Sequence, residues 1–185
     1  LRDRLSDITT RYRDNLLEQS CGSFWEKHFC WPFDIVEHEG RIGVVAPFFD
    51  KAFFFEHGSK EDDKLNIKGR DKEGKWFVGS LRDRHLDPRE KGNWLTYFQI
   101  CLAMARAVRR LHMAGLSHSD LSYKNVLLDP TSGRACLIDL DGLVVPGKHA
   151  PDVVGTPDFI APEVVATQHL ERDDPNRKLP SQATD

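Results

Sequence analysis

The sequence predicts an α+β fold, and three stretches carry that prediction. Residues 94–113 have the apolar spacing of a long amphipathic helix. Residues 33–46 and 126–138 each have the pattern of two short strands around a turn. A chain of 185 residues can bury one substantial core. We therefore expect hairpins packed beside helices.

The first expected element is a helix over residues 5–19. Leu5, Ile8, Tyr12 and Leu16 recur at intervals of three to four residues and form one apolar face. Two strands should follow at 33–36 and 41–46, because the Glu39-Gly40 pair between them has turn composition. The second strand leads into residues 46–49.

We expect residues 51–92 to form a charged insertion, and its most polar part runs from Glu56 to Gly92. An apolar patch at 76–78 interrupts its charged runs. We expect a short strand pair around Asp71 to Gly74 and an otherwise flexible, solvated rim.

The long helix at 94–113 has an N-cap in Asn93 and a left-handed C-terminal glycine in Gly115. Its predicted apolar face consists of Leu95, Phe98, Leu102, Ala105 and Leu111. Strands at 126–128 and 135–138 follow, joined by a turn at 129–133. This hairpin should place Asn125 and Asp139 at neighbouring strand ends.

Composition excludes several classes of function. A net charge of −3 and a pI near 6.3 give no electrostatic case for binding nucleic acid or an anionic membrane. No apolar run approaches 18 residues, and the charged N-terminus is unlike a signal peptide, so a cytoplasmic protein is expected. The four cysteines, at 21, 30, 101 and 136, form no C-x-x-C pair and are expected to be reduced.

The chemistry is concentrated in the stretch His118-Ser-Asp-Leu-Ser-Tyr-Lys-Asn125 and in Asp139-Leu-Asp-Gly142. A carboxylate, an amide five residues later and a second carboxylate after a hairpin are the groups that phosphoryl transfer requires. The segment Gly155-Thr-Pro-Asp-Phe-Ile-Ala-Pro-Glu163 completes an ordered set.

These three motifs resemble H-x-D-x-x-x-x-N, D-F-G and A-P-E of eukaryotic-like Ser/Thr protein kinases. The resemblance implies a two-lobed, kinase-like fold of which this chain holds part of each lobe. Residues 1–50 would belong to the N-lobe and hinge, 51–92 to the insertion, and 93–185 to the C-lobe. It also implies an ATP- and Mg²⁺-dependent transferase that phosphorylates a protein, with Ser/Thr expected.

The resemblance assigns roles by position. Asp120 corresponds to the carboxylate that accepts a hydrogen bond from the substrate hydroxyl, and Asn125 and Asp139 to the magnesium ligands. Since leucine and aspartate replace the phenylalanine and glycine of D-F-G, Asp141 is the alternative ligand in a register shifted by two. We favour Asp139, because it continues the strand without a gap, and expect Asp141 near the same metal.

Two other positions near Asp120, that of the lysine and that of Ser119, depart from the usual pattern. Lys124 can reach the transferred phosphate, but Ser/Thr kinases more often carry that lysine where Ser122 stands, which leaves tyrosine specificity open. Ser119 replaces an arginine that binds a phosphorylated activation loop, so control by other means is expected. His118 is expected to be structural, and Thr156 can hydrogen-bond Asp120 and Lys124.

The N-lobe elements are incomplete by comparison with the family. Neither a glycine-rich loop nor a strand with the phosphate-binding lysine precedes Asp120. Glu18 would pair with that lysine, with Asp14 and Glu26 as alternatives. Substitutes for the lysine would be sought first at 27 and 51. The isolated chain is therefore expected to bind ATP weakly and to lack turnover.

Backbone groups around Ala46 and Phe48, in the hinge position, would contact adenine. The sequence around the motifs is also similar to that of bacterial kinases from tellurium-resistance-type gene clusters. This similarity implies a phosphatase and a von Willebrand A domain protein as partners. Two other functions stay open: a pseudokinase or interaction module, and a small-molecule kinase, which would lack Gly-Thr-Pro and Ala-Pro-Glu.

Overall fold

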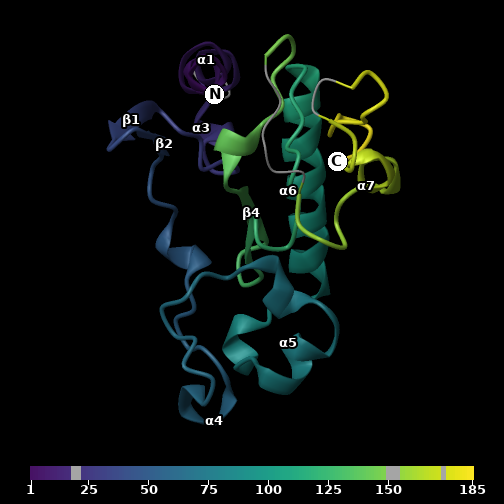
Figure 1. The fold of residues 1–185 in the computed structure, drawn as a ribbon. Helices are drawn as coiled ribbons and strands as arrows, with labels where there is room; N and C mark the ends of the chain where they lie inside the picture. Colours follow the sequence, from purple (N-terminus) through teal and green to yellow (C-terminus); the bar gives the residue numbers. More distant parts are fainter. Residues whose placement is uncertain (18–21, 149–154, 172–173) are drawn as a thin grey trace.

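The computed structural model describes residues 1–17, 22–148, 155–171 and 174–185 (Figure 1). The α-helices are α1 (Arg2–Asp7), α2 (Arg13–Leu17), α3 (Gly22–Trp25), α4 (Lys60–Asp63), α5 (Gly79–His85), α6 (Trp94–Met113) and α7 (Pro162–Thr167). The strands are β1 (Asp34–His38), β2 (Arg41–Val45), β3 (Val126–Asp129) and β4 (Arg134–Leu137). A π-helix, η1 (Ile8–Tyr12), and four 3₁₀ segments, η2 (Lys51–Phe53), η3 (Gly74–Phe77), η4 (Pro88–Glu90) and η5 (Leu140–Gly142), complete the described elements.

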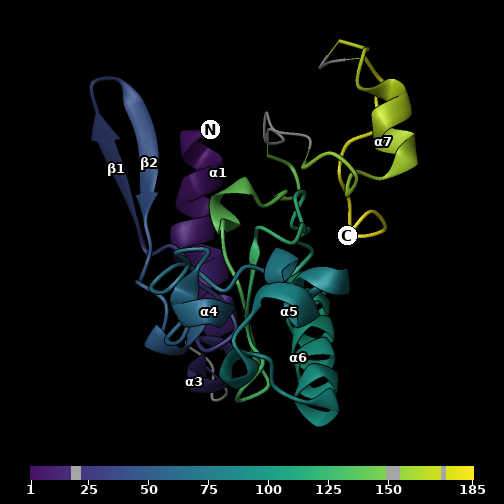
Figure 2. The same ribbon diagram turned by 90° about the horizontal axis from the view of Figure 1, so that it is seen from below.

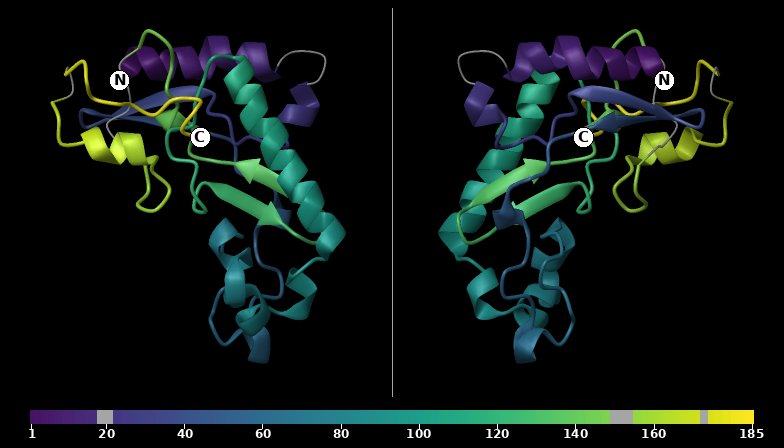
Figure 3. Two further views of the ribbon diagram at one scale, coloured as in Figure 1. Left: turned by 90° about the vertical axis from the view of Figure 1, so that its right-hand side faces the viewer. Right: turned by 90° about the vertical axis from the view of Figure 1, so that its left-hand side faces the viewer.

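The strands form two separate antiparallel hairpins, β1–β2 and β3–β4. The β3–β4 hairpin packs along α6 in the middle of the molecule, with α1 at one end and α4 and α5 at the other (Figures 1 and 3). The β1–β2 hairpin extends beside α1 (Figure 2), where Arg2 forms an ion pair of 2.7 Å with Glu37. The catalytic motifs therefore lie in the loops between the central hairpin, α1 and α7.

The N-terminal helical prediction is confirmed for the described residues. Consecutive α1, η1 and α2 bury Leu5, Ile8, Tyr12 and Leu16, as the apolar spacing predicts. The indole N–H of Trp31 donates to the Ile8 carbonyl at 2.8 Å and ties this helix to the following loop. The expected partner of a phosphate-binding lysine, at position 18, lies outside the described residues.

Both predicted hairpins are confirmed. Glu39 and Gly40 have φ values of 50° and 74°, the left-handed pair that a two-residue hairpin turn requires. The second hairpin pairs Val126 with Leu137 and Leu127 with Cys136, and its strands are mostly buried.

The long helix α6 begins and ends as predicted. Asn93 and Thr96 form a reciprocal capping box, and Gly115 follows the helix with φ 81°. The predicted apolar face, however, is mostly wrong: Leu95, Phe98 and Leu102 are 66%, 69% and 52% exposed.

The packed face of α6 carries Thr96, Ile100, Ala107 and Leu111 instead. Both faces of this helix are rich in apolar residues, so spacing alone did not identify the one that meets the β3–β4 hairpin. Only Leu111 belongs to both the predicted and the observed face.

The expected strand pair around Asp71 to Gly74 is also wrong. Asp71 and Glu73 make single β-bridges to different segments, Asp71 to Phe54 and Glu73 to Leu127. The backbone groups of this segment bond to β3 and to the preceding loop instead of to each other, so no local hairpin forms. Gly74 begins η3. The segment is anchored rather than a solvated rim, since Phe55, Phe77 and other apolar side chains are buried.

A buried ion cluster fixes this segment to the hairpin. Lys72 is 3% exposed, and its ammonium lies 2.8 Å from Glu90 and 3.8 Å from Asp129. Glu90 also accepts the backbone N–H of His57 and Gly58. Burial of charge is tolerable only with such pairing, so the cluster sets how residues 51–92 sit on β3.

Among the helices of the described residues, none has the length and apolar character needed to cross a bilayer.

Candidate active site

The β3–β4 hairpin brings the amide and the second carboxylate together, as predicted. The backbone N–H of Ile138 donates to the carbonyl of Asn125 at 3.0 Å, so Asp139 follows directly beside Asn125. Asp139 adopts a left-handed conformation, with φ 63° and ψ 45°. A non-glycine residue in that region is strained and must be held by its surroundings, which is common at functional sites.

Asp120 lies opposite this pair, with both carboxylate oxygens occupied. Oδ1 accepts the backbone N–H of Thr156 at 2.7 Å, and Oδ2 accepts the side-chain amide of Asn125 at 2.9 Å. The Gly-Thr-Pro motif thus touches the catalytic loop through its backbone. The Thr156 hydroxyl bonds Ser122 at 3.3 Å, and no contact with Lys124 is recorded for the described part of the chain.

Asn125 is oriented for cation binding. It is 8% exposed, and its Nδ2 donates twice to Asp120, to the carboxylate and to the backbone carbonyl. The amide oxygen takes part in neither bond and stays available to a hard cation.

The acidic side chains converge on the same point. Burial, a hydrogen bond with Asp141 and the negative charges of Asp141 and Asp120 together raise the pKa of Asp139 to about 6. The Asp139 side chain nevertheless reaches solvent. Carboxylates crowded in this way are stabilised by a cation, and Asp139 and Asp141 are the two carboxylates predicted to bind it.

No group of three or more His, Cys, Asp or Glu side chains in the described ranges is arranged to hold a metal ion alone. Magnesium usually takes one or two protein carboxylates and completes its shell with water and substrate phosphates, so it does not need such a group. Asn125 and Asp139, with Asp141 beside them, fit a Mg²⁺–nucleotide complex rather than a closed metal site.

Short contacts hold the catalytic loop in place. His118 is 1% exposed, its Nε2 lies 3.1 Å from the Ile138 carbonyl, and burial lowers its pKa, which favours the neutral ring and the structural role predicted for it. Ser119, with φ 66°, donates its hydroxyl to the Gly142 carbonyl at 2.8 Å. These contacts join the loop that carries Asp120 to the loop that carries Asp139 and Asp141.

Asp185 is a positioning residue whose contacts the sequence did not predict. Its carboxylate, 2% exposed, accepts the backbone N–H of His118 at 2.8 Å and of Ser119 at 3.3 Å, and lies 3.0 Å from His112. Residues 182–184 form a turn that ends at Asp185. Nothing local to this turn indicates its contact with the catalytic loop.

The remaining predicted residues lie at the rim. Lys124, four residues after Asp120, is exposed, whereas Ser122 is 2% exposed. Ala46 is exposed in the segment after β2, and Phe48, 83% exposed, stacks on Phe49 and Phe54.

Neither proposed substitute for the phosphate-binding lysine is recorded in contact with Asp120 or Asp139 in the described ranges. Lys27 lies on the wall of a separate cavity, and Lys51 begins η2.

Comparison with known proteins gives consistent results. The sequence profile of the protein kinase domain matches residues 83–174. The dual serine/threonine and tyrosine protein kinase of Apis mellifera is 38% identical over 85 residues, which are 46% of this chain and 9% of that protein. Proteins of the same description from Gallus gallus and Homo sapiens are 41% identical over 69 residues, 37% of this chain and 7% of each.

The fold is similar to a solved kinase domain. The crystal structure of the Toxoplasma gondii specific rhoptry antigen kinase domain superimposes with a TM-score of 0.50 and 17% identity. The match covers 97% of this chain and 49% of that one. The chain therefore spans about half of that domain and less than a tenth of the curated relatives it matches.

Proposed function

Because residues 83–174 belong to a eukaryotic-like protein kinase domain, we propose that this chain supplies the catalytic loop for phosphoryl transfer from ATP to a protein hydroxyl. The observation that carries the proposal is Asp120, held between the Thr156 backbone and the Asn125 amide beside Asp139. Phosphoryl transfer needs one carboxylate to bind the acceptor hydroxyl, and a separate amide and carboxylate to bind the metal.

The residues act mainly by positioning. Asp120 orients the acceptor hydroxyl and takes its hydrogen bond, which contributes on the order of 10²–10⁴ in rate for a general base. Asn125 and Asp139 would hold the magnesium ion, which, when bound, offsets phosphate charge. Lys124, exposed and four residues after Asp120, would reach the transferred phosphate. Backbone groups near Ala46 and Phe48 would contact the adenine ring.

Serine and threonine are the proposed acceptors, with tyrosine as a second candidate. The position of Lys124 supports tyrosine, since the usual Ser/Thr-kinase position holds the buried Ser122. The relatives from Apis mellifera and Gallus gallus are also described as dual serine/threonine and tyrosine kinases. A small-molecule kinase is less well supported, because the Gly-Thr-Pro motif is present and contacts Asp120 through Thr156.

The proposed division of the chain is residues 1–50 as N-lobe and hinge, 51–92 as an insertion and 93–185 as C-lobe. A pseudokinase would share this division but transfer no phosphate. The bacterial origin, the cytoplasmic location, and the phosphatase and von Willebrand A partners stay predictions.

The function is tested by incubating the full-length protein with labelled ATP, Mg²⁺ and a generic protein substrate, followed by phosphoamino acid analysis. We expect phosphoserine or phosphothreonine. Phosphotyrosine would favour the second candidate. Nucleotide binding without transfer, unchanged in an Asp139→Ala variant, would identify a pseudokinase.

A further inference from the structure

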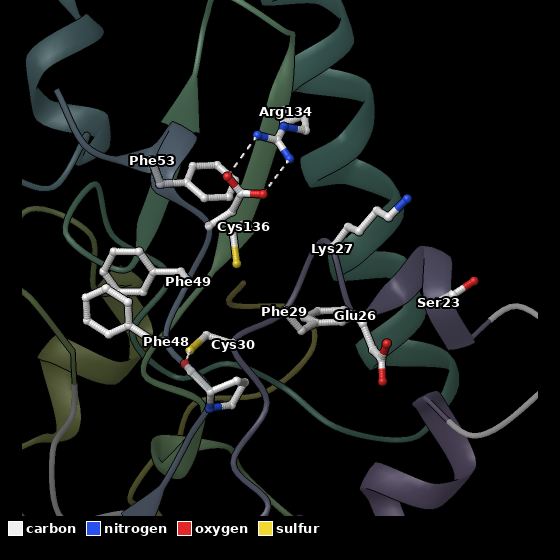
Figure 4. A pocket seen from close by; sticks show the side chains of 12 residues that line it. Ser23, Glu26, Lys27, Phe29, Cys30, Phe48, Phe49, Phe53, Arg134 and Cys136 are labelled. Atoms are coloured by element: carbon white, nitrogen blue, oxygen red, sulfur yellow. Dashed lines mark hydrogen bonds and ion pairs between the residues drawn. The ribbon is translucent and has the colours of Figure 1, made fainter. Parts of the chain in front are cut away.

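A cavity of about 330 Å³ lies on the side of β4, away from the residues around Asp120. Its wall carries the rings of Phe29, Phe49 and Phe53 and the thiols of Cys30 and Cys136 (Figure 4). The two sulfur atoms point into the same space from different segments of the chain (Figure 4). Phe48, near which adenine would bind, also lines it, whereas Asp120, Asn125 and Asp139 do not.

The backbone explains why both thiols face this cavity. Residues 28–30 run parallel to β4: the Leu137 N–H donates to the His28 carbonyl at 2.8 Å, and the Cys30 N–H donates to the Leu137 carbonyl at 2.9 Å. Side chains alternate along extended segments, so the bridged pair Phe29 and Leu137 faces the main core. Cys30 and Cys136, one step outward on each segment, face the opposite side with Phe53.

This register decides what could join the two sulfur atoms. Across the parallel bridge of Phe29 and Leu137, Cys30 and Cys136 are offset by two residues, which places their Cα atoms roughly 8 Å apart for strands about 4.8 Å apart with a rise of about 3.3 Å per residue. A disulfide usually requires Cα atoms about 4.4–6.8 Å apart, so direct oxidation is disfavoured. A metal bridge is longer, because each metal–sulfur bond adds about 2.3 Å. The spacing of Cys30 and Cys136 therefore suits an intervening ion better than a direct bond.

The number of protein ligands available at this cavity favours some metal ions over others. Structural zinc needs about four protein ligands, and the described residues contain no group of three or more His, Cys, Asp or Glu side chains suited to a metal. A pair of thiols surrounded by phenylalanine rings instead matches a soft ion that accepts two sulfur ligands.

We propose that Cys30 and Cys136 form a two-thiolate site for a soft monovalent cation of the Cu(I) type. Binding forms two copper–sulfur bonds and releases both thiol protons to water, with no electron transferred. The product carries one net negative charge. Arg134 lies in the same wall, where it pairs with Asp50 at 3.3 Å and with Asp129 at 3.7 Å.

The free thiols are protected until such an ion arrives. Burial raises the pKa of Cys30, and burial together with the charge of Cys30 raises the pKa of Cys136 to about 12. Both groups are therefore neutral at pH 7 and poor nucleophiles. The Cys30 thiol donates to the Pro47 carbonyl at 2.9 Å, a bond that the metal would replace. The ion would thus also affect the segment that follows β2.

The experiment is an anaerobic titration of the full-length protein with Cu(I), buffered by a chromogenic chelator, with bound copper measured by elemental analysis. We expect Cys30→Ser and Cys136→Ser each to bind one ion fewer than the parent protein. The matched control is Cys101→Ser, because Cys101 is exposed on α6 outside the cavity. It should bind as the parent does.

Three results would overturn the proposal: unchanged copper binding in Cys30→Ser, an equal loss in Cys101→Ser, or a Cys30–Cys136 disulfide in the protein as purified under air. If Cys136→Ser does not fold, as judged by circular dichroism, the half-exposed Cys30 alone decides the outcome. Nucleotide binding and phosphotransfer are not part of this readout, so failure of the proposed kinase function would leave the result intact.

Discussion

Replacing Asp120 by asparagine separates the catalytic role of its carboxylate from its structural role. The change keeps the size of the side chain but replaces one oxygen by an NH₂ group. Both oxygens now accept hydrogen bonds, from the Thr156 backbone at 2.7 Å and from the Asn125 amide at 2.9 Å. In either orientation, the new NH₂ group faces another donor, which is either the Thr156 backbone N–H or the Asn125 side-chain amide. Asp120→Asn therefore loses one of these two bonds as well as the base.

The two losses have different magnitudes. Loss of a general base should lower kcat by about 10²–10⁴-fold. A partly buried donor left without its acceptor should lower the free energy of unfolding by about 1–3 kcal/mol. Affinity for Mg²⁺–ATP should change little, because the proposed metal ligands, Asn125 and Asp139, are intact.

The assay measures three quantities on the full-length protein: initial rates against ATP concentration, nucleotide affinity by calorimetry, and unfolding in urea. Asp158→Asn is the matched control, since it makes the same chemical change at an exposed residue of the neighbouring loop. Asparagine also tolerates the φ of 74° found there.

Two outcomes would refute the reasoning. Near-parental kcat in Asp120→Asn would remove the base role. An equal loss of nucleotide affinity and kcat would show that Asp120 acts through the metal site. A loss of kcat without any loss of stability would contradict only the hydrogen-bond argument.

Three further predictions follow from the same contacts. Asp139→Ala should weaken Mg²⁺-dependent nucleotide binding more than Asp141→Ala in matched calorimetric titrations; the reverse order would mean that the metal register is shifted by two residues. Since the pKa of Asp139 is raised from 3.8 to about 6, the folded state holds this proton more tightly than the unfolded state, so its contribution to stability falls as pH rises through this window. Mg²⁺ needs the ionised form, so Mg²⁺-dependent nucleotide binding should strengthen from pH 5 to 7, and a pH-independent affinity would contradict this. Lys72→Met should lower the free energy of unfolding, measured by urea titration, by about 3–5 kcal/mol, because it leaves buried carboxylates unpaired. The control Lys75→Met, at a partly exposed ion pair, should lower it by about 0–1 kcal/mol. Equal effects of the two substitutions would show that the buried cluster does not stabilise the fold.

Local signals in the sequence predicted the elements that depend on neighbouring residues. The Asn93 cap, Gly115, the Glu39-Gly40 turn and the hairpin beside Asn125 each encode their geometry within a few residues. These features were confirmed because their main determinants are backbone propensity and short-range hydrogen bonds.

Long-range partners could not be predicted in this way. Nothing local to Lys72 indicates that Glu90 and Asp129 will neutralise it, so a charged stretch was interpreted as a solvated rim. The packed face of α6 was also missed, because two apolar faces compete and tertiary contacts select one. The role of Asp185 depends on a contact with Ser119, 66 residues earlier in the chain.

The replacement of the usual arginine by Ser119 is explained by the contacts that hold the catalytic loop. Ser119 bonds the Gly142 carbonyl, His118 lies against the Ile138 carbonyl, and Asp185 accepts both of their backbone N–H groups. None of these contacts needs an added phosphate.

The charged contacts of the metal-side loop run instead to helix α1. The Arg4 guanidinium donates to the Asp141 carbonyl at 3.4 Å, and Asp7 pairs with Lys148 at 3.4 Å. A shift of α1 would disturb the loop that carries Asp139, whereas the bonds from the His118 and Ser119 backbone to Asp185 would persist. Two sets of contacts therefore act on the site: the Asp185 carboxylate orders the catalytic loop, and the position of α1 influences the metal ligands.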